Sequence, residues 1–354
     1  MSLDALNASN GIEEQEVEDV GETTYLVTAG VLIAIGVLGA VLNMTVIIVI
    51  LRDRQTLLTP VNVVLLNLVV SVKIHAVCVA FTSIIIIGDF CVSIIGTPFP
   101  TVSAILGRWY WGYTGCLWYA WFMSTLGLAS IGNLTVLAIE RWLLVTRPMR
   151  AFTIRQASYL VSGVWIYTLS LTIPPLCGWG SYGPEAGNLS CSVSWEVHDP
   201  SIGSDTYIAF LFFFGLVVPV ILICWSYFEI IRTLRKVRKR AGSRGTYEAK
   251  VTKMVALMII AFLIAWTPYS ISALLAQYLQ VTSSPTVAIV PALLAKSSIC
   301  YNPLIYAGMN SQFRTVMKKF LGMSESTRPA TISQHTGVSA SNRAGINPIQ
   351  IEKE

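Results

Sequence analysis

The stretch ALLAKSSICYNPLIYAGMNSQF, residues 292–313, holds a single lysine, Lys296, in an apolar segment rich in small residues, shortly before Asn302-Pro303. A charged side chain inside a membrane costs about 2.5–3.5 kcal/mol on insertion scales, so such a lysine indicates a functional site by default. What Lys296 does therefore depends on whether the segment around it crosses a bilayer.

The chain is far more apolar than a soluble protein. Hydrophobic residues fill 54% of its 354 positions and charged residues 12%, whereas about a quarter of the residues of a soluble domain are charged. Seven apolar runs reach the roughly 20 residues that span a bilayer. They cover residues 25–51, 60–97, 113–138, 156–179, 205–231, 251–279 and 285–308. The sequence predicts an all-α membrane protein, a seven-transmembrane helix bundle over residues 25–308.

Basic residues set the orientation, because cytoplasmic loops hold Lys and Arg. They gather after odd-numbered spans, most densely from Arg232 to Lys253, whereas residues 1–24 hold seven acids and no base. We expect a multi-pass plasma-membrane protein with an extracellular N-terminal tail, residues 1–24, and a cytoplasmic C-terminus. The acidic start does not match the basic beginning of a cleavable signal peptide.

Two kinds of outer-side feature agree with this orientation. Sequons at Asn7 and Asn188 lie in the external tail and in the loop after span four, where glycosylation can occur. Cys116 stands at the outer start of span three and Cys191 in that same loop. An oxidising compartment lets such cysteines pair, so we expect a disulfide that pins the loop across the mouth of the bundle.

Short motifs narrow the seven-span plan. They are Glu140-Arg141-Trp142 ending span three, Pro219 and Tyr227 in span five, Trp266-Thr267-Pro268-Tyr269 in span six, and Asn302-Pro303-Leu304-Ile305-Tyr306 in span seven. In this order, together with Asn43 and Trp165, the set resembles rhodopsin-like (class A) G-protein-coupled receptors over residues 25–321. Trp142 departs from the more usual tyrosine but keeps the charge pair before it.

The resemblance implies a switch at the cytoplasmic end. Arg141 is always charged, and Glu140 or Glu248 can hold it in an ion pair. Breaking that pair would free span six to swing and open a cleft for a G protein. The expected switch residues are Glu140, Arg141, Tyr227, Glu248, Asn302, Pro303, Tyr306 and Asp89.

Lys296 can now be interpreted. A lysine six residues before Asn-Pro-x-x-Tyr is typical of opsins, so the resemblance implies that Lys296 binds retinal, 11-cis or all-trans, as a Schiff base; a neutral amine condenses with an aldehyde. The implied pocket residues are Tyr119, Ser124, Gly127, Leu211, Phe212, Trp266, Tyr269, Ala292 and Ala295. The alternative is a lysine that snorkels, or pairs with an acid, in a receptor for another ligand.

A buried cation needs a counterion. Tyr119 stands where vertebrate visual pigments have a glutamate, three residues beyond the span-three cysteine. Glu185, six residues before Cys191, matches the loop glutamate that serves many non-visual opsins, so we expect it to be the counterion, with Tyr119 as a hydrogen-bond partner. A distant counterion usually goes with a bistable pigment. The alternative for Glu185 is a solvated loop acid.

Span two departs from the family. Asn67-Leu68-Val69-Val70-Ser71 begins its usual motif, but Val72 stands where the family has aspartate, and Asp89 resumes the pattern seventeen residues later. We expect residues 72–88 to be an in-frame insertion, such as an unspliced intron. Seventeen extra helical residues add roughly 25 Å, nearly another membrane thickness. The alternative is a genuine elongated span with Val72 at the hub.

The C-terminal part divides in two. Residues 309–322 have the apolar spacing of an amphipathic eighth helix on the inner leaflet. Residues 323–354 have the composition of a disordered tail, whose serines and threonines could recruit arrestin once phosphorylated or simply be solvated. The basic run 232–240 lies between two spans, which favours membrane lipid and a G protein over nucleic acid.

The leading prediction is a light-activated receptor, not an enzyme, that signals through a heterotrimeric G protein of the Gi/o type. Two short runs, 116–121 and 293–297, look most like the neuropsin-like non-visual opsins. A retinal photoisomerase without signalling is the first alternative, although the intact motifs around Arg141 and Asn302 favour signalling. A receptor for a diffusible ligand is the second, and Lys296 argues against it. No metal-binding cluster is evident in the sequence.

Overall fold

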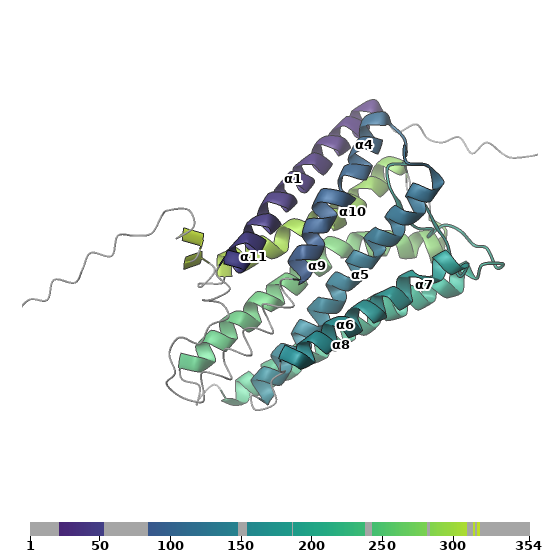
Figure 1. The fold of residues 1–354 in the computed structure, drawn as a ribbon. Helices are drawn as coiled ribbons and strands as arrows, with labels where there is room; N and C mark the ends of the chain where they lie inside the picture. The colour runs from purple at the N-terminus through teal and green to yellow at the C-terminus, as the bar shows by residue number, and fades with distance from the viewer. Residues whose placement is uncertain are drawn as a thin grey trace, which may run out of the picture.

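A computed structural model describes residues 21–52, 84–147, 154–185, 187–237, 243–281 and 284–309, together with 314, 315, 317 and 318. Within these ranges the chain forms a bundle of long helices (Figure 1). Six helical segments are long and apolar enough to cross a membrane, and the nineteen-residue helix α6 (Ile154–Thr172) is the seventh of the bundle. The predicted seven-helix bundle is confirmed.

The first four spans are helices of unequal length. They are α1 (Glu22–Arg52), a second span at Ile84–Leu106 that contains the π-helical turn η2 (Val92–Gly96) and α4 (Pro98–Leu106), α5 (Gly112–Thr146), and α6. The second span had been expected at 60–97. It ends instead at Gly107, whose φ of 67° is left-handed, because Pro98 at the first position of α4 needs no backbone donor and lets the helix continue.

The last three spans contain local irregularities. They are α7 (Ser204–Phe212) continuing through the π-helical turn η5 (Phe213–Val217) into α8 (Val218–Val237), α9 (Ser243–Leu279), and α10 (Pro285–Ser297) continuing through the 3₁₀ turn η6 (Ser298–Cys300) into α11 (Tyr301–Met309). The turn η6 begins two residues after Lys296. Of the expected eighth helix, only residues 314, 315, 317 and 318 are described, and all four are helical.

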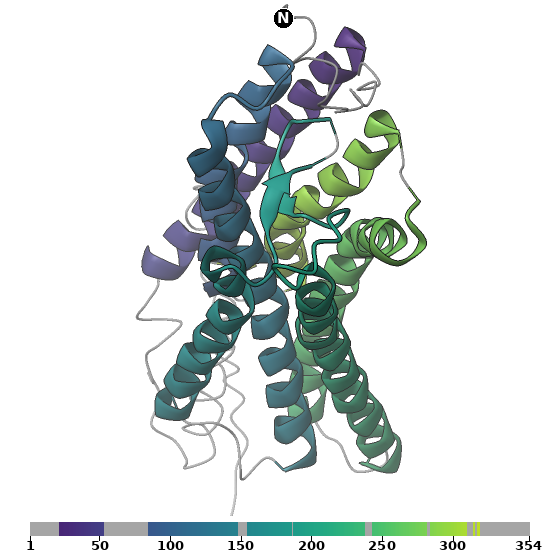
Figure 2. The same cartoon turned by 90° about the vertical axis from the view of Figure 1, so that its right-hand side faces the viewer.

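A small antiparallel hairpin covers the outer part of the bundle. Strand β1 (Tyr182–Pro184) pairs with β2 (Cys191–Val193) so that Pro184 faces Cys191. Figure 2 shows the two strands standing between the helices at the end of the bundle where α1 begins. The expected disulfide joins Cys116 of α5 to Cys191, and their Cα atoms lie 5.4 Å apart. The bridge therefore holds the hairpin against α5.

Buried polar side chains join spans one, two and seven. The Asn302 side-chain amide donates to Asp89 Oδ2 at 3.0 Å, and the Asn43 amide donates to the Ile299 carbonyl at 3.0 Å. All three polar side chains belong to residues no more than 5% exposed. Asp89 thus occupies a polar hub between the second and seventh spans. Val72, the alternative residue for this hub, lies outside the described residues.

The structure also shows what the end of the proposed insertion does. Residues 72–83 lie outside the described ranges, but residues 84–88 form the turn of helix before Asp89. Ile85 and Ile86 are buried in the inner core, 2% and 0% exposed. Deleting 72–88 would bring Leu68 and Val69 to these two positions, so the replacement side chains are also apolar.

We predict that deleting residues 72–88 leaves the fold intact and raises the thermal unfolding midpoint of the purified protein. The shorter chain keeps Asp89 on the same helical face without about 25 Å of additional helix. Asp89→Val in the shorter chain is the matched control, and its loss of the Asn302 bond should lower the midpoint again. A deletion that unfolds at a lower temperature than the full chain would show that residues 72–88 belong to the functional protein.

Candidate functional site

One cavity in the outer half of the bundle brings the predicted pocket together. Its wall comes from α5, the hairpin, α7, α9 and α10. All eleven residues expected at the site line it: Tyr119, Ser124, Gly127, Glu185, Leu211, Phe212, Trp266, Tyr269, Ala292, Ala295 and Lys296. They come from segments far apart in the sequence, so their meeting follows from the fold.

Lys296 and Glu185 form a mostly buried ion pair. Their side chains are 13% and 17% exposed, and Lys296 Nζ lies 3.9 Å from Glu185 Oε2. Ser190 lies between the two groups: its hydroxyl accepts from Lys296 Nζ at 3.5 Å and donates to Glu185 Oε2. The alternative of a solvated loop acid is therefore wrong for Glu185.

The hairpin turn holds Glu185 in place. Glu185 follows β1 directly, and its backbone N–H donates to the Ser190 carbonyl at 2.8 Å. Burial alone would raise the pKa of the Glu185 carboxyl, but the Lys296 charge and hydrogen bonds from Ser190, Tyr269 and Ser192 outweigh it and lower that pKa. A charged carboxylate therefore faces Lys296 at neutral pH.

The second oxygen of Glu185 has its own donor. The Tyr269 hydroxyl donates to Glu185 Oε1 at 2.8 Å, and the Trp195 indole N–H donates to the Tyr269 oxygen at 3.1 Å. Sequence reasoning had predicted Tyr269 but missed Trp195 and Ser190. Their only signal was their proximity to Cys191, four residues before Trp195 and one after Ser190.

Tyr119 has a different surrounding from the one expected. Its side chain is 1% exposed and lines the cavity, with the rings of Phe99 and Trp109 at centroid distances of 5.7 and 5.4 Å. Its hydroxyl has no hydrogen-bond partner among the described residues. A buried polar atom without a partner is costly, and the expected hydrogen bond from Tyr119 to Glu185 is not formed in the structure.

An aromatic side chain forms part of the inner wall of the cavity. The Trp266 indole N–H donates to Ser298 Oγ at 3.2 Å, and its ring stacks on Phe262 with centroids 5.5 Å apart. A Cβ atom at Gly127 would lie 2.9 Å from the Trp266 ring, closer than normal contact. Gly127 is therefore needed for this ring position. Sequence reasoning predicted Gly127 and Trp266 but missed their neighbours Ser298 and Phe262.

The cytoplasmic end holds the predicted charge pair. Arg141 donates from Nε and a terminal nitrogen to the two Glu140 carboxylate oxygens, at 2.5 and 2.6 Å. The two residues are 1% and 3% exposed. The Tyr227 hydroxyl donates to the Thr252 carbonyl at 3.3 Å, across the gap between α8 and α9. The side chain of Glu248 lies outside the described residues, so the structure shows Glu140 as a partner of Arg141.

Pro303 and Tyr306 lie in α11, where both are buried. Pro268 stands inside α9, one residue before Tyr269. Pro268 thus lies at the level of the cavity, between the lining residues Trp266 and Tyr269, whereas Pro303 follows the lining residue Ile299 toward the cytoplasmic end. At both positions the missing backbone donor favours bending.

One of the two sequons lies within the described residues. Asn188 is exposed and lies in the hairpin turn with a φ of 52°, which is compatible with an attached glycan. Asn7 lies outside the described residues. Glycosylation at both positions stays a prediction.

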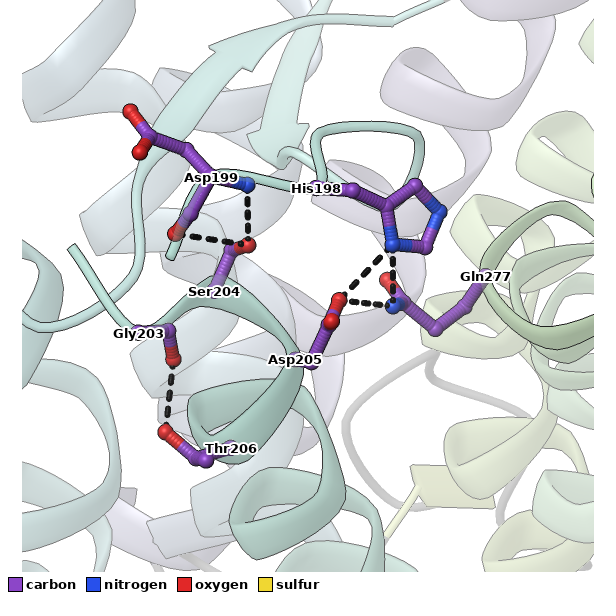
Figure 3. A network of polar contacts seen from close by, with 7 residues as sticks. All are labelled: His198, Asp199, Gly203, Ser204, Asp205, Thr206 and Gln277. Atoms are coloured by element: carbon purple, nitrogen blue, oxygen red, sulfur yellow. Dashed lines mark hydrogen bonds and ion pairs between the residues drawn. The ribbon is translucent and has the colours of Figure 1, made fainter. Parts of the chain in front are cut away.

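A second polar network lies on the outer side of the site (Figure 3). Gln277 of α9 donates to Asp205 of α7 at 2.7 Å, and His198 Nδ1 lies 2.8 Å from the same carboxylate oxygen. The Gln277 residue is 3% exposed. The network ties the segment that follows β2 to the outer end of α9, two turns beyond Tyr269.

Comparisons with known proteins agree with this geometry. The family model for the 7 transmembrane receptor (rhodopsin family) matches residues 42–306. Melanopsin of Homo sapiens is 31% identical over 323 residues, which cover 86% of this chain and 63% of melanopsin. Visual pigment-like receptor peropsin of Mus musculus is 33% identical over 319 residues, which cover 88% of each chain. The chain spans just under two thirds of the length of the melanopsins that it matches.

A solved structure gives the same fold. The crystal structure of squid rhodopsin superposes with a TM-score of 0.74 at 24% identity, covering 86% of this chain and 87% of that one. The neuropsin-like assignment within the non-visual opsins stays a prediction. The family match and the similarity to peropsin over most of both chains identify this multi-pass membrane protein as a member of the rhodopsin family of seven-transmembrane receptors, opsin-like and of the non-visual type.

Proposed function

We propose that this protein is a light-sensing receptor that binds retinal covalently at Lys296 and activates a heterotrimeric G protein when the retinal isomerises. One observation carries the proposal: a primary amine lies in the wall of a largely apolar cavity, next to a buried carboxylate. Stability alone does not explain such a pair, because the cost of removing two charges from water can exceed their mutual attraction. A lysine placed to react with an aldehyde explains both its position and the presence of Glu185.

The residues around Lys296 fit retinal. Phe212 and Trp266 supply aromatic walls, and Gly127, Ala292 and Ala295 leave room beside them. Retinal, when bound, supplies the absorption of visible light and the change of shape that follows.

Lys296 and Glu185 have separate roles in this proposal. Lys296 would hold retinal, because its neutral amine can condense with the aldehyde to give a Schiff base and release one water molecule. Glu185 then holds the proton on that nitrogen, because an anion 3.9 Å away stabilises the cation. Ser190 and Tyr269 keep the carboxylate charged and in position. Glu185 lies in the loop, so we also propose a bistable pigment whose all-trans form stays bound and is photoreverted.

The cytoplasmic end couples this event to a partner. Movement of α9 at Pro268 would separate Tyr227 from Thr252 and expose the Glu140–Arg141 pair to a G protein, which we propose to be of the Gi/o type. Arrestin binding to the phosphorylated tail and lipid contacts of the basic run 232–240 are proposed with it. We also propose that the protein lies in the plasma membrane with its N-terminus outside, an orientation that places the Cys116–Cys191 disulfide on the oxidising side.

We predict that Lys296→Ala abolishes the light-sensitive absorption band that wild-type protein forms with 11-cis-retinal. Lys296→Arg is the matched control: it keeps a positive charge beside Glu185 but has no nucleophilic amine, so it should also form no band. Dark and illuminated difference spectra measure both variants. A full band in either variant would contradict covalent binding at Lys296.

We predict that Glu185→Gln shifts the visible band to shorter wavelength at neutral pH, because the linkage loses its proton. Removing one partner of a buried ion pair costs about 3–5 kcal/mol. This cost lowers the pKa of the protonated linkage at Lys296 by about 2–4 units. In wild type the pair persists above the ordinary pKa of glutamate, about 4.3, and is lost as the pH falls through the lowered pKa of Glu185.

The exposed loop acid Glu196 supplies the control for that titration. Glu196→Gln removes the same charge without a contact to Lys296 and should leave the titration within a few tenths of a unit. Equal shifts in the two variants would mean that loop charge in general, and not Glu185, holds the proton.

Signalling separates this proposal from a retinal photoisomerase. We predict that Arg141→Gln keeps the absorption band but lowers light-driven nucleotide exchange on a Gi/o protein at least tenfold, because the group exposed to the G protein is lost. Exchange assays in membranes, with absorption spectra of the same samples, measure the two properties independently. Wild-type protein that isomerises retinal but drives no exchange on any G-protein class would instead indicate the isomerase.

A further inference from the structure

The indole of Trp195 acts on Glu185 through Tyr269. A tyrosine hydroxyl has one proton to donate and two lone pairs that accept. Trp195 donates its N–H to the Tyr269 oxygen at 3.1 Å, and an indole N–H can only donate. One lone pair of Tyr269 is therefore occupied, and its single proton is directed to Glu185 Oε1 at 2.8 Å.

This chain of donors favours the charged form of Glu185. Successive hydrogen bonds in a low-dielectric site polarise one another, and each strengthens the next by about 10–30%. The Trp195 donor therefore strengthens the hydrogen bond that Tyr269 donates to the Glu185 carboxylate. The other Glu185 oxygen receives the Ser190 hydroxyl, so both oxygens have a donor whose direction is set by a neighbour.

Trp195 is held where it can do this. It lies two residues after β2 and four after the disulfide cysteine Cys191. Its ring packs against Phe212 with centroids 5.6 Å apart, and it lines the cavity. Farther along the same segment, Asp205 binds Gln277 of α9 (Figure 3). The segment thus contacts α9 at Tyr269 and, about two turns farther out, at Gln277.

We propose that Trp195 is a positioning residue for the counterion: it fixes the direction of the Tyr269 proton and thereby keeps Glu185 ionised beside the Lys296 linkage. The inference rests on the proposed function, because its measurable consequence is a property of the pigment. Trp195 itself contacts neither charged group in this role. Its effect passes entirely through the Tyr269 hydroxyl.

Trp195→Phe tests the proposal, since it removes the N–H and keeps an aromatic ring against Phe212. The acid titration of the visible band reports protonation of Glu185. Trp195→Phe leaves the Tyr269–Glu185 bond in place and removes only its strengthening by about 10–30%. For a hydrogen bond to a charged group this corresponds to a few tenths of a unit, roughly, in that midpoint, and we expect the midpoint to rise by that amount. Trp195→His can still offer a ring N–H to Tyr269, so its midpoint should lie between those of Trp195→Phe and wild type.

Trp179→Phe is the matched control. Trp179 lies in the same outer loop and also donates its indole N–H, to Thr206 Oγ1 at 2.9 Å, but it does not line the cavity with Glu185. It should leave the titration unchanged. A midpoint that rises equally in both tryptophan variants would overturn the proposal in favour of general loop loosening.

A double-mutant cycle with Tyr269→Phe decides whether the effect passes through the hydroxyl. Tyr269→Phe alone should raise the midpoint, and adding Trp195→Phe should then raise it no further. Additive shifts, or an unchanged midpoint in Trp195→Phe, would overturn the role of Trp195 while leaving a Lys296-dependent pigment in place. A wild-type chain that forms no pigment would instead overturn the proposed function, and this inference with it.

Discussion

The ion pair between Lys296 and Glu185 is the interaction on which the outer half of the molecule depends. A lysine in the seventh span is expensive in a membrane unless a partner meets it, and that partner comes from a loop more than a hundred residues earlier. The loop must therefore enter the bundle. The hairpin, its disulfide to α5 and the turn around Ser190 all serve to bring one carboxylate to one amine.

The remainder of the site follows from that requirement. A charged pair in an apolar cavity needs donors for both carboxylate oxygens, and Ser190 and Tyr269 supply them. Small residues such as Gly127 leave space where Trp266 approaches α5. At the other end of the bundle, Glu140 and Arg141 form a second buried pair. Pro268 and the hub around Asp89 lie between the two pairs, and in the proposed function they let the helices bend between the retinal-binding end and the switch end.

Much of the fold could be predicted from the sequence because membrane spans are long and strongly apolar. The pocket residues were predictable because motifs in spans three, five, six and seven fix helix positions, and all eleven line one cavity. The bounds of the second span were not predictable, since hydropathy does not show where Gly107 ends a helix that passes through Pro98. Trp195 and Ser190 were missed because a loop has no periodicity, and their contacts depend on the path set by the disulfide.

In the proposed function, Lys296 is the attachment point of an aldehyde ligand. The most direct test is to incubate the purified protein with 11-cis-retinal, reduce it with borohydride in the light, digest it and locate the retinyl group by peptide mass. We expect the added mass on the peptide that contains Lys296. The Lys296→Ala protein, treated in the same way, should carry no added mass. A retinyl group on another lysine, or none on a protein that absorbs visible light, would contradict this expectation.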